Sequence, residues 1–240
     1  MSDDDPIFHL FGAAHFGAVG VTAVIGLSVI LVARSGHFPR VVLWQNVVLG
    51  LAMMWSYPTT ILTRYATGYS IDDVMLPMHL CDWAAIAGFI AMFWGRAGAC
   101  EVLYFFGLAG TTQGLLTPAI AIGFPHPTFF AFFLLHSSVV VSALYLPLGL
   151  RWRPRPGVYR RMCGWALVYL AAAGFVDFVT GQNYGFLRAK PGESLMNAMG
   201  EWPFYIPVLV GLAFAFFAFL SLPFLAYRPF RKGLPPADRS

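Results

Sequence analysis

Charged residues are scarce in this 240-residue chain: they make up 11% of it, whereas hydrophobic residues make up 58%. So little charge excludes an ordinary soluble domain, and the apolar runs have the length that a helix needs to cross a bilayer. In a soluble protein, the net charge of +4 and the pI near 9.1 would favour a nucleic-acid partner. Here the basic residues lie in short connections between apolar runs, so we expect no nucleic-acid binding.

Cysteine is also rare, and the first residues lack the basic segment of a secretory signal. Cys81 lies near the start of one apolar run, whereas Cys100 and Cys163 fall at helix ends that belong to the opposite side of a membrane. A disulfide framework is therefore excluded.

The chain begins with acidic residues, Asp3 to Asp5, and a full-length apolar run follows them. We expect no cleaved signal peptide.

The apolar runs predict seven transmembrane helices in a single domain that spans residues 1–240. Their ranges are 9–33, 40–63, 76–95, 99–118, 127–149, 160–181 and 203–227, followed by a flexible cytoplasmic tail over 228–240. The connections on one side hold twelve Lys and Arg residues, and those on the other side hold three. Positive charge gathers on the cytoplasmic side, so we expect the N-terminus outside and the C-terminus in the cytoplasm. The predicted fold class is all-α, a polytopic integral membrane protein.

Polar side chains collect in the outer half of the predicted helices. Ionisable groups in a bilayer cost roughly a few kcal/mol or more, so these side chains should face a common interior rather than lipid. We therefore predict a polar pocket that opens towards the outer leaflet. Its predicted substrate-binding residues are His15, His79, Asp82, Gln113, Thr117 and Asp177, joined by Asn183 and Tyr184 from the long outer connection 182–202.

The residues with the most reactive side chains lie between Leu76 and Asp82. Pro77 suits the first position of a helix, which would place Cys81 in the second turn, where a helix N-terminus stabilises a thiolate. His136 lies at a similar depth and could act as the base that a nucleophilic thiol requires. His79 and Asp82 share one face, whereas Cys81 points about 160° away from His79. The pocket should therefore contain either Cys81 or the His79 and Asp82 pair.

Structural roles compete with each of these assignments. A lone histidine such as His15 often serves only as an interhelical hydrogen-bonding residue, and Asp177 can simply cap its helix. Cys81 continues a stripe of small residues, so it can be a packing residue. Gln113 and Thr117 suit structural or substrate-positioning roles better than catalysis.

Several blocks of the sequence are specific enough to compare with known families. They are Leu76-Pro77-Met78-His79-Leu80-Cys81, His136, Asn183-Tyr184-Gly185-Phe186-Leu187 with Lys190-Pro191, Gly200-Glu201-Trp202-Pro203, His15 and Leu116-Thr117-Pro118. These blocks resemble the YwaF family of bacterial integral membrane proteins, whose animal relative is a transmembrane lipid acyltransferase. Met78 stands where the family more often has leucine. The resemblance implies a multi-pass protein of the bacterial plasma membrane that moves acyl chains between phospholipids, with Cys81 as nucleophile and His136 as base.

Three hypotheses of function follow. The first is a membrane enzyme that transfers or hydrolyses the acyl chains of phospholipids or lysophospholipids through a Cys81 thioester, without a cofactor or a metal. The second is a metal-dependent seven-span lipid hydrolase with histidine and aspartate ligands, although no HExxH or CxxC spacing supports it. The third is a transporter or receptor for a small amphiphile, although the polar layer lies off the midplane and no inverted repeat is evident. The sequence leaves the acyl donor, the acceptor and the oligomeric state open.

Overall fold

The computed structural model describes residues 5–68, 76–191 and 195–225, and the secondary-structure elements of this part of the chain are all helices. It contains no β-strand, only an isolated bridge between Ile7 and Ile122. The predicted tail over 228–240 lies outside the described residues. The elements are α1 (Ala13–Ser35), α2 (Pro39–Ala66), α3 (Leu80–Trp94), α4 (Ala97–Phe106), the π-helix η1 (Gly107–Thr111), α5 (Thr112–Leu116), α6 (Pro127–Leu148), α7 (Val158–Thr180), the 3-10 helices η2 (Tyr184–Phe186) and η3 (Leu195–Met199), and α8 (Tyr205–Leu225).

Four of these helices, α1, α6, α7 and α8, are long and apolar enough to cross a membrane. Helix α3 is also apolar but shorter. The all-α membrane class is therefore confirmed, and at least one helix overlaps each of the seven predicted ranges. The count of seven crossings and the orientation stay predictions.

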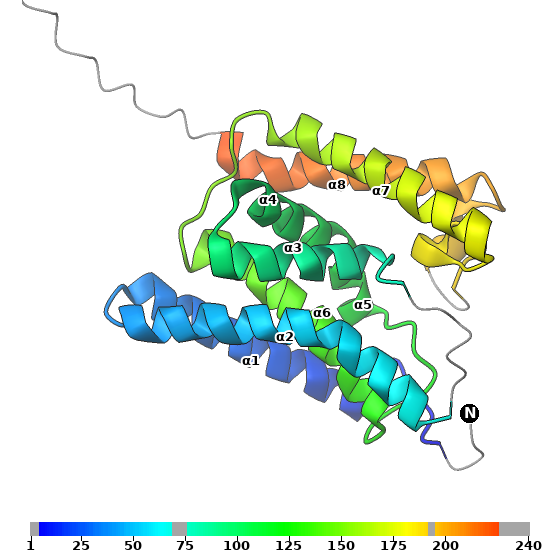
Figure 1. The fold of residues 1–240 in the computed structure, drawn as a ribbon, viewed down its shortest axis with the longest axis horizontal. Helices are drawn as coiled ribbons and strands as arrows, with labels where there is room; N and C mark the ends of the chain where they lie inside the picture. The colour runs from blue at the N-terminus through cyan, green and yellow to red at the C-terminus, as the bar shows by residue number, and fades with distance from the viewer. Residues whose placement is uncertain (1–4, 69–75, 192–194, 226–240) are drawn as a thin grey trace, which may run out of the picture.

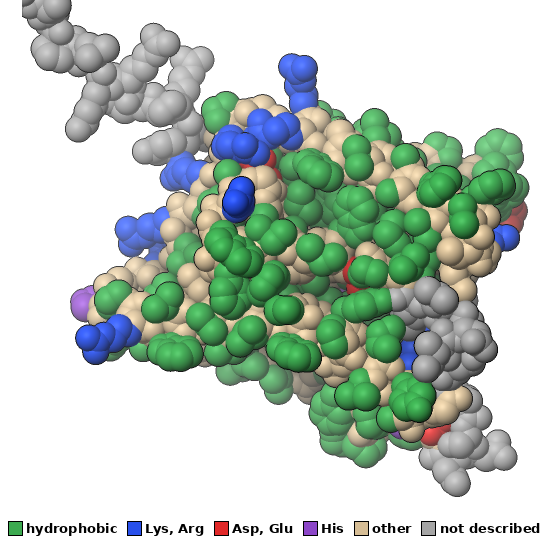
Figure 2. Space-filling view, viewed as in Figure 1, with side chains coloured by type: hydrophobic (Ala, Val, Ile, Leu, Met, Phe, Trp, Pro, Cys, Tyr) green, Lys and Arg blue, Asp and Glu red, His purple; other side chains and the backbone are tan. Residues whose placement is uncertain are grey.

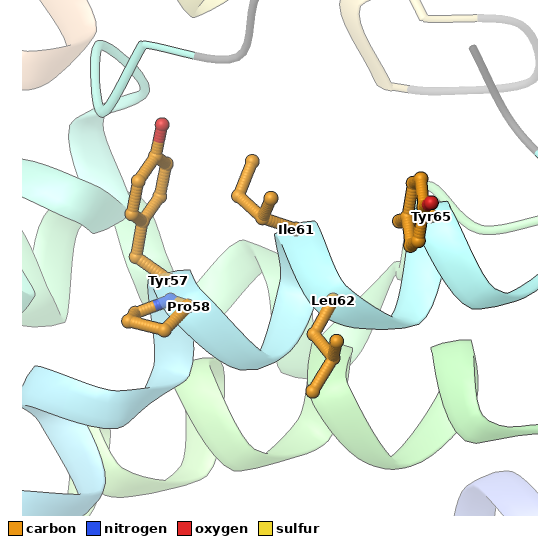
Figure 3. A pocket seen from close by; sticks show the side chains of 5 residues that line it. All are labelled: Tyr57, Pro58, Ile61, Leu62 and Tyr65. Atoms are coloured by element: carbon orange, nitrogen blue, oxygen red, sulfur yellow. The ribbon is translucent and has the colours of Figure 1, made fainter. Parts of the chain in front are cut away.

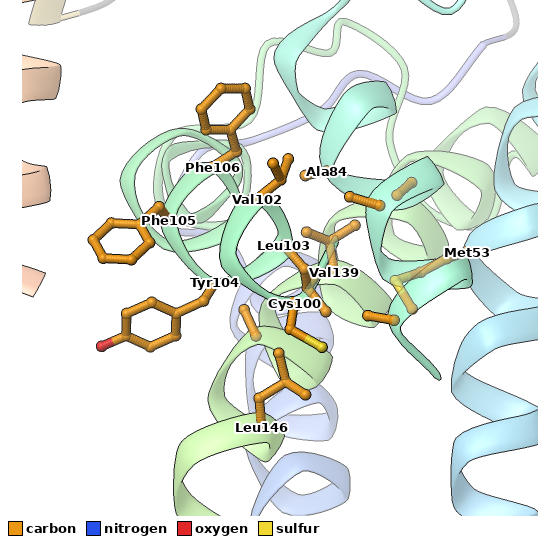
Figure 4. Close-up of a cluster of buried hydrophobic side chains, with 14 of the residues drawn as sticks. Met53, Ala84, Cys100, Val102, Leu103, Tyr104, Phe105, Phe106, Val139 and Leu146 are labelled. Carbon is orange, nitrogen blue, oxygen red and sulfur yellow. The ribbon is translucent and has the colours of Figure 1, made fainter. Parts of the chain in front are cut away.

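Helix α6 is at the centre of the helix packing. It contacts α1, α2, α3 and α4, whereas α7 and α8 pack on each other and reach the remainder through α4 and η1. In Figure 1, α7 and α8 lie side by side along one edge of the molecule and α1 and α2 run along the opposite edge. The main hydrophobic core lies between these edges and includes buried side chains of α3, α4 and α6, shown in part in Figure 4.

Small residues allow the central helices to approach closely. Gly88 of α3 faces α2 and α4, and a Cβ atom there would overlap the sulfur of Met53 and press on Leu103. Small residues are common where membrane helices pack, because they let backbones come together. The same applies to Gly107, which faces Val139 and Ala143 of α6.

Helices α4 and α5 are joined without a break by the π-helix η1. This segment has five residues, Gly107–Thr111. A π-helix adds an extra residue to a turn and so changes which side chains share a face. Downstream of Gly107, a Cβ at Gly110 would overlap Leu80 of α3, and one at Gly114 would overlap the ring of His136. The segment thus sets the contacts of α4 and α5 with the start of α3 and with His136.

A buried carboxylate fixes the start of α7 against α4. Glu101 is fully buried and accepts hydrogen bonds from Nη2 of Arg155 at 2.8 Å and from Nη2 of Arg161 at 2.7 Å. The backbone N–H of Arg155 also donates to Glu101, at 2.9 Å. A buried charge is tolerated when it is paired and hydrogen-bonded in this way. Figure 2 shows that most visible Lys and Arg side chains lie at this end of the molecule, where α2 and α7 begin.

Candidate functional site

Helix α3 begins with a hydrogen-bonded cap formed by His79 and Asp82. The N–H of His79 donates to Oδ2 of Asp82 at 3.0 Å, and the carbonyl of His79 accepts from the N–H of Asp82 at 3.0 Å. His79 is therefore the N-cap and Leu80 the first helical residue. The prediction that Pro77 occupies that position is wrong, because the Asp82 bond sets the helix start three residues later. Cys81 consequently lies in the first turn, not in the second.

Cys81 is a free, half-buried thiol that packs against the main hydrophobic core. The backbone N–H of Cys81 belongs to the first turn of α3, whereas the N–H of Asp82 donates to the carbonyl of His79. Tyr169 of α7 lies close enough to interact electrostatically with Cys81, and its ring meets Trp83 edge-on at 5.4 Å. The first N–H groups of a helix lack helical partners, so they can stabilise a thiolate or a developing oxyanion.

His136 has the tautomer that a general base requires. Its Nδ1 lies 2.8 Å from the carbonyl oxygen of Phe132, and a carbonyl only accepts, so Nδ1 carries the hydrogen and Nε2 carries the lone pair. The ring stacks on Phe132 at 4.0 Å and fills the space beside Gly114. His79 lies close enough to interact electrostatically with it. Within the described residues, however, no hydrogen bond joins His136 to Cys81.

The outer connection folds over the start of α3 through Tyr184. The N–H of Tyr184 donates to Oδ1 of Asp177 at 2.7 Å, and its phenolic oxygen accepts from the N–H of Leu76 at 2.8 Å. The rings of His79 and Tyr184 meet edge-on at 5.2 Å. Asp177 therefore positions Tyr184, and Tyr184 in turn covers the segment that carries His79 and Cys81.

The start of α3 presents two faces to different neighbours. Asp82 and Tyr184 both interact electrostatically with Tyr57 of α2, and His79 interacts with Tyr184 and His136. Tyr169 of α7 interacts electrostatically with both Cys81 and Asp82. The structure thus places the ring of His79 against Tyr184 at 5.2 Å, and the ring of Trp83, two residues after Cys81, against Tyr169 at 5.4 Å.

His15 lies apart from this cluster and ties α1 to the end of α5. Its Nδ1 accepts from the N–H of Phe11 at 3.1 Å, and its Nε2 donates to the carbonyl of Leu115 at 2.7 Å. Both ring nitrogens are occupied and the side chain is only 2% exposed. The contacts of His15 are those of a structural histidine.

Three other predicted binding residues also make contacts within their own segments or face outwards. Gln113 is exposed. The hydroxyl of Thr117 donates to the carbonyl of Gln113 at 3.2 Å. The side chain of Asn183 closes its own loop: Oδ1 accepts from the N–H of Arg188 at 2.9 Å, and Nδ2 donates to the carbonyl of Ala189 at 2.8 Å. We therefore keep none of the three in the candidate site.

Tyr169 belongs to the site although the sequence interpretation did not single it out. The side chain is buried, and its hydroxyl has no hydrogen-bond partner in the described part of the chain. Oδ2 of Asp177, also on α7, is likewise buried without a partner. The two residues are eight apart, hence about 80° apart around the helix. In the sequence, two polar residues at this spacing in an apolar run were the signal that could have pointed to Tyr169.

An apolar groove on α2 leads away from this cluster. It has a volume of about 520 Å³ and is lined by Tyr57, Pro58, Ile61, Leu62 and Tyr65. Figure 3 shows Tyr57, Ile61 and Tyr65 rising from the same side of α2, whereas Leu62 points the other way. Residues four apart share a face of a helix. The groove thus begins at Tyr57, which interacts electrostatically with Asp82 and Tyr184, and follows the second half of α2.

No metal-binding cluster is present in the part of the chain that the structure describes. No three His, Cys, Asp or Glu side chains come together in a way that could hold a metal ion. His15 has both nitrogens occupied by protein groups, and Asp82 caps its own helix. The ligand set of the metal-dependent hydrolase hypothesis is therefore not assembled among these residues.

Comparison with known proteins gives one finding. The family model of the TMEM164 family, a transmembrane protein family, matches residues 10–221. No curated protein and no solved structure gives a significant match. The resemblance to the YwaF family and the location in a bacterial plasma membrane stay predictions. The match covers most of the chain, including α1 to α7 and nearly all of α8, so this membrane protein belongs to the TMEM164 family.

Proposed function

We propose that this protein is a membrane enzyme that transfers acyl chains between phospholipids and lysophospholipids through a thioester on Cys81. The observation that carries the proposal is the position of Cys81, a free thiol, in the first turn of α3. A helix N-terminus activates a thiol in this way. Membership of a transmembrane family agrees with a substrate that is itself a membrane lipid.

His136 is the proposed base. Its Nε2 carries the lone pair, so it can take the thiol proton and later return it to the leaving alcohol. Catalytic contacts are often long before substrate binds. We propose that lipid binding brings Nε2 of His136 and the sulfur of Cys81 within hydrogen-bonding distance, with His79 beside them.

We also propose seven crossings, with the N-terminus outside and the α3 start in the outer half of the membrane. The gathering of Lys and Arg at the opposite end supports this orientation. A lipid then reaches the site sideways from the outer leaflet, along the groove on α2.

Filling this groove is expected to weaken lipid use without changing the chemical step. Replacing Ile61 with Trp should raise the KM for the lipid about tenfold, because a filled groove loses several methylene contacts. Leu43→Trp, at an exposed site elsewhere on α2, is the matched control and should leave the KM unchanged. Transfer rates at increasing lipid concentration measure both variants. An unchanged KM for Ile61→Trp would show that the lipid does not reach the site along this groove.

The thioester itself is the direct test of the proposed function. Purified protein in nanodiscs is mixed with a phospholipid whose acyl chain is labelled and quenched with acid. We expect label on the peptide that contains Cys81, and its release by hydroxylamine at neutral pH. Acyl transfer without labelled protein would contradict the thioester. Tight lipid binding without any transfer would instead favour a transporter or receptor.

A further inference from the structure

The hydroxyl of Tyr169 is unusual for a buried tyrosine. The residue is only 8% exposed, and its hydroxyl has no hydrogen-bond partner in the part of the chain that the structure describes. A buried tyrosine hydroxyl normally finds a partner, because leaving it unpaired loses the bonds it made to water. A buried donor without an acceptor therefore points to an acceptor that arrives with a ligand.

Packing fixes the direction of this hydroxyl. The Tyr169 ring meets Trp83 edge-on at 5.4 Å and Phe106 at 6.3 Å, so α3 and α4 hold it on two sides. Gly185 leaves room for the hydroxyl, since a Cβ there would lie 2.6 Å from the phenolic oxygen. The 3-10 helix η2 thus packs directly over the hydroxyl at Gly185, and the contact with Trp83 keeps Tyr169 beside the start of α3.

We infer that Tyr169 is a catalytic residue whose hydroxyl donates a hydrogen bond to the carbonyl oxygen of the acyl group that Cys81 attacks. The inference rests on the proposed function. Backbone N–H groups in the first turn of α3 supply the second donor, so the two elements form an oxyanion hole. A neutral phenol suits this role, because it donates to an oxyanion and brings no competing charge.

The bonding changes balance without a further reactant. The thiolate of Cys81 bonds to the ester carbon, and the carbonyl π pair moves to the oxygen that Tyr169 and the N–H groups hold. When this intermediate collapses, the carbon–oxygen bond to the lysolipid breaks. The leaving oxygen takes the proton that His136 removed from Cys81. Tyr169 keeps its hydrogen throughout.

Replacing Tyr169 with Phe separates a catalytic hydroxyl from a structural one. Thioester formation on Cys81 should slow by about 10²–10³-fold, as for the loss of one oxyanion donor, while the KM for the lipid stays unchanged. The melting temperature should stay the same or rise, because the lost hydroxyl has no partner in the resting protein. Tyr104→Phe is the matched control: its hydroxyl bonds the Leu220 carbonyl at 3.4 Å, so stability should fall slightly and the rate should hold.

The outcomes distinguish this inference from the proposed function. A wild-type protein that forms no thioester overturns both. A wild-type protein that forms the thioester, with Tyr169→Phe forming it at the same rate, overturns only the role of Tyr169. A fall in melting temperature that accompanies the loss of rate would assign Tyr169 a structural role.

Discussion

Replacing Cys81 with Ala is expected to abolish acyl transfer, with a loss on the order of 10³-fold or more, because no other group can form the thioester. The variant should fold, since Cys81 is half-buried and alanine fits a stripe already formed by Ala84 and Ala85. Lipid binding should persist. The measurement is the initial rate of transfer of a labelled acyl chain in nanodiscs, together with the melting temperature.

The two other cysteines provide matched controls. Cys100 is buried in the first turn of α4, the helix that follows the end of α3, and Cys163 lies in the first half of α7. Cys100→Ala and Cys163→Ala should therefore keep the wild-type rate. If Cys81→Ala transferred acyl chains as fast as these two variants, the nucleophile would have to lie elsewhere.

Replacing His136 with Gln is expected to slow transfer by about 10²–10⁴-fold, the usual contribution of a general base. The glutamine has room, because the wild-type ring already fills the space beside Gly114. The dependence of rate on pH is the specific readout. The wild-type profile should have an acidic limb that reports the free Nε2, and His136→Gln should lack it.

His15 allows the same substitution with a different expected result. Its two nitrogens bond to Phe11 and Leu115, so His15→Gln should lower the melting temperature and leave the pH profile unchanged. An acidic limb that disappears in His15→Gln and persists in His136→Gln would make His15 the base and His136 the structural histidine.

Proline shows how far helix starts can be predicted from the sequence. Helix α6 starts at Pro127, the first residue of the range 127–149, and Nδ1 of the preceding His126 accepts from the N–H of Thr128 at 3.2 Å. Pro77 has the same local preference, but the bond between Asp82 and the N–H of His79 sets the start of α3. The preference of proline for the first helical position decides where a helix starts only if no side-chain hydrogen bond favours another start.

The sequence nominates Cys81 of α3 and His136 of α6 as site residues, and these assignments stay predictions. Depth along the helices indicated that Cys81 and His136 lie in one layer. The side of α3 that meets α7 depends on how whole helices pack, and this packing is what brings Tyr169 to Cys81. The π-helix before Gly114 escaped prediction for a similar reason, since its extra residue is held by contacts with α3 and α6.

The hydrogen bond between Leu76 and Tyr184 couples the start of α3 to the segment that contains η2, which forms a lid over that start. Tyr184 is held by Asp177 at its backbone and by Leu76 at its phenol. Release of the lid therefore removes a restraint on the residues just before the helix, and a lipid that orders those residues strengthens the lid by the same free energy. Such linkage is reciprocal. For the proposed lipid ligand, the dwell time and the mobility of the first turn of α3 are thus two measurements of the same equilibrium.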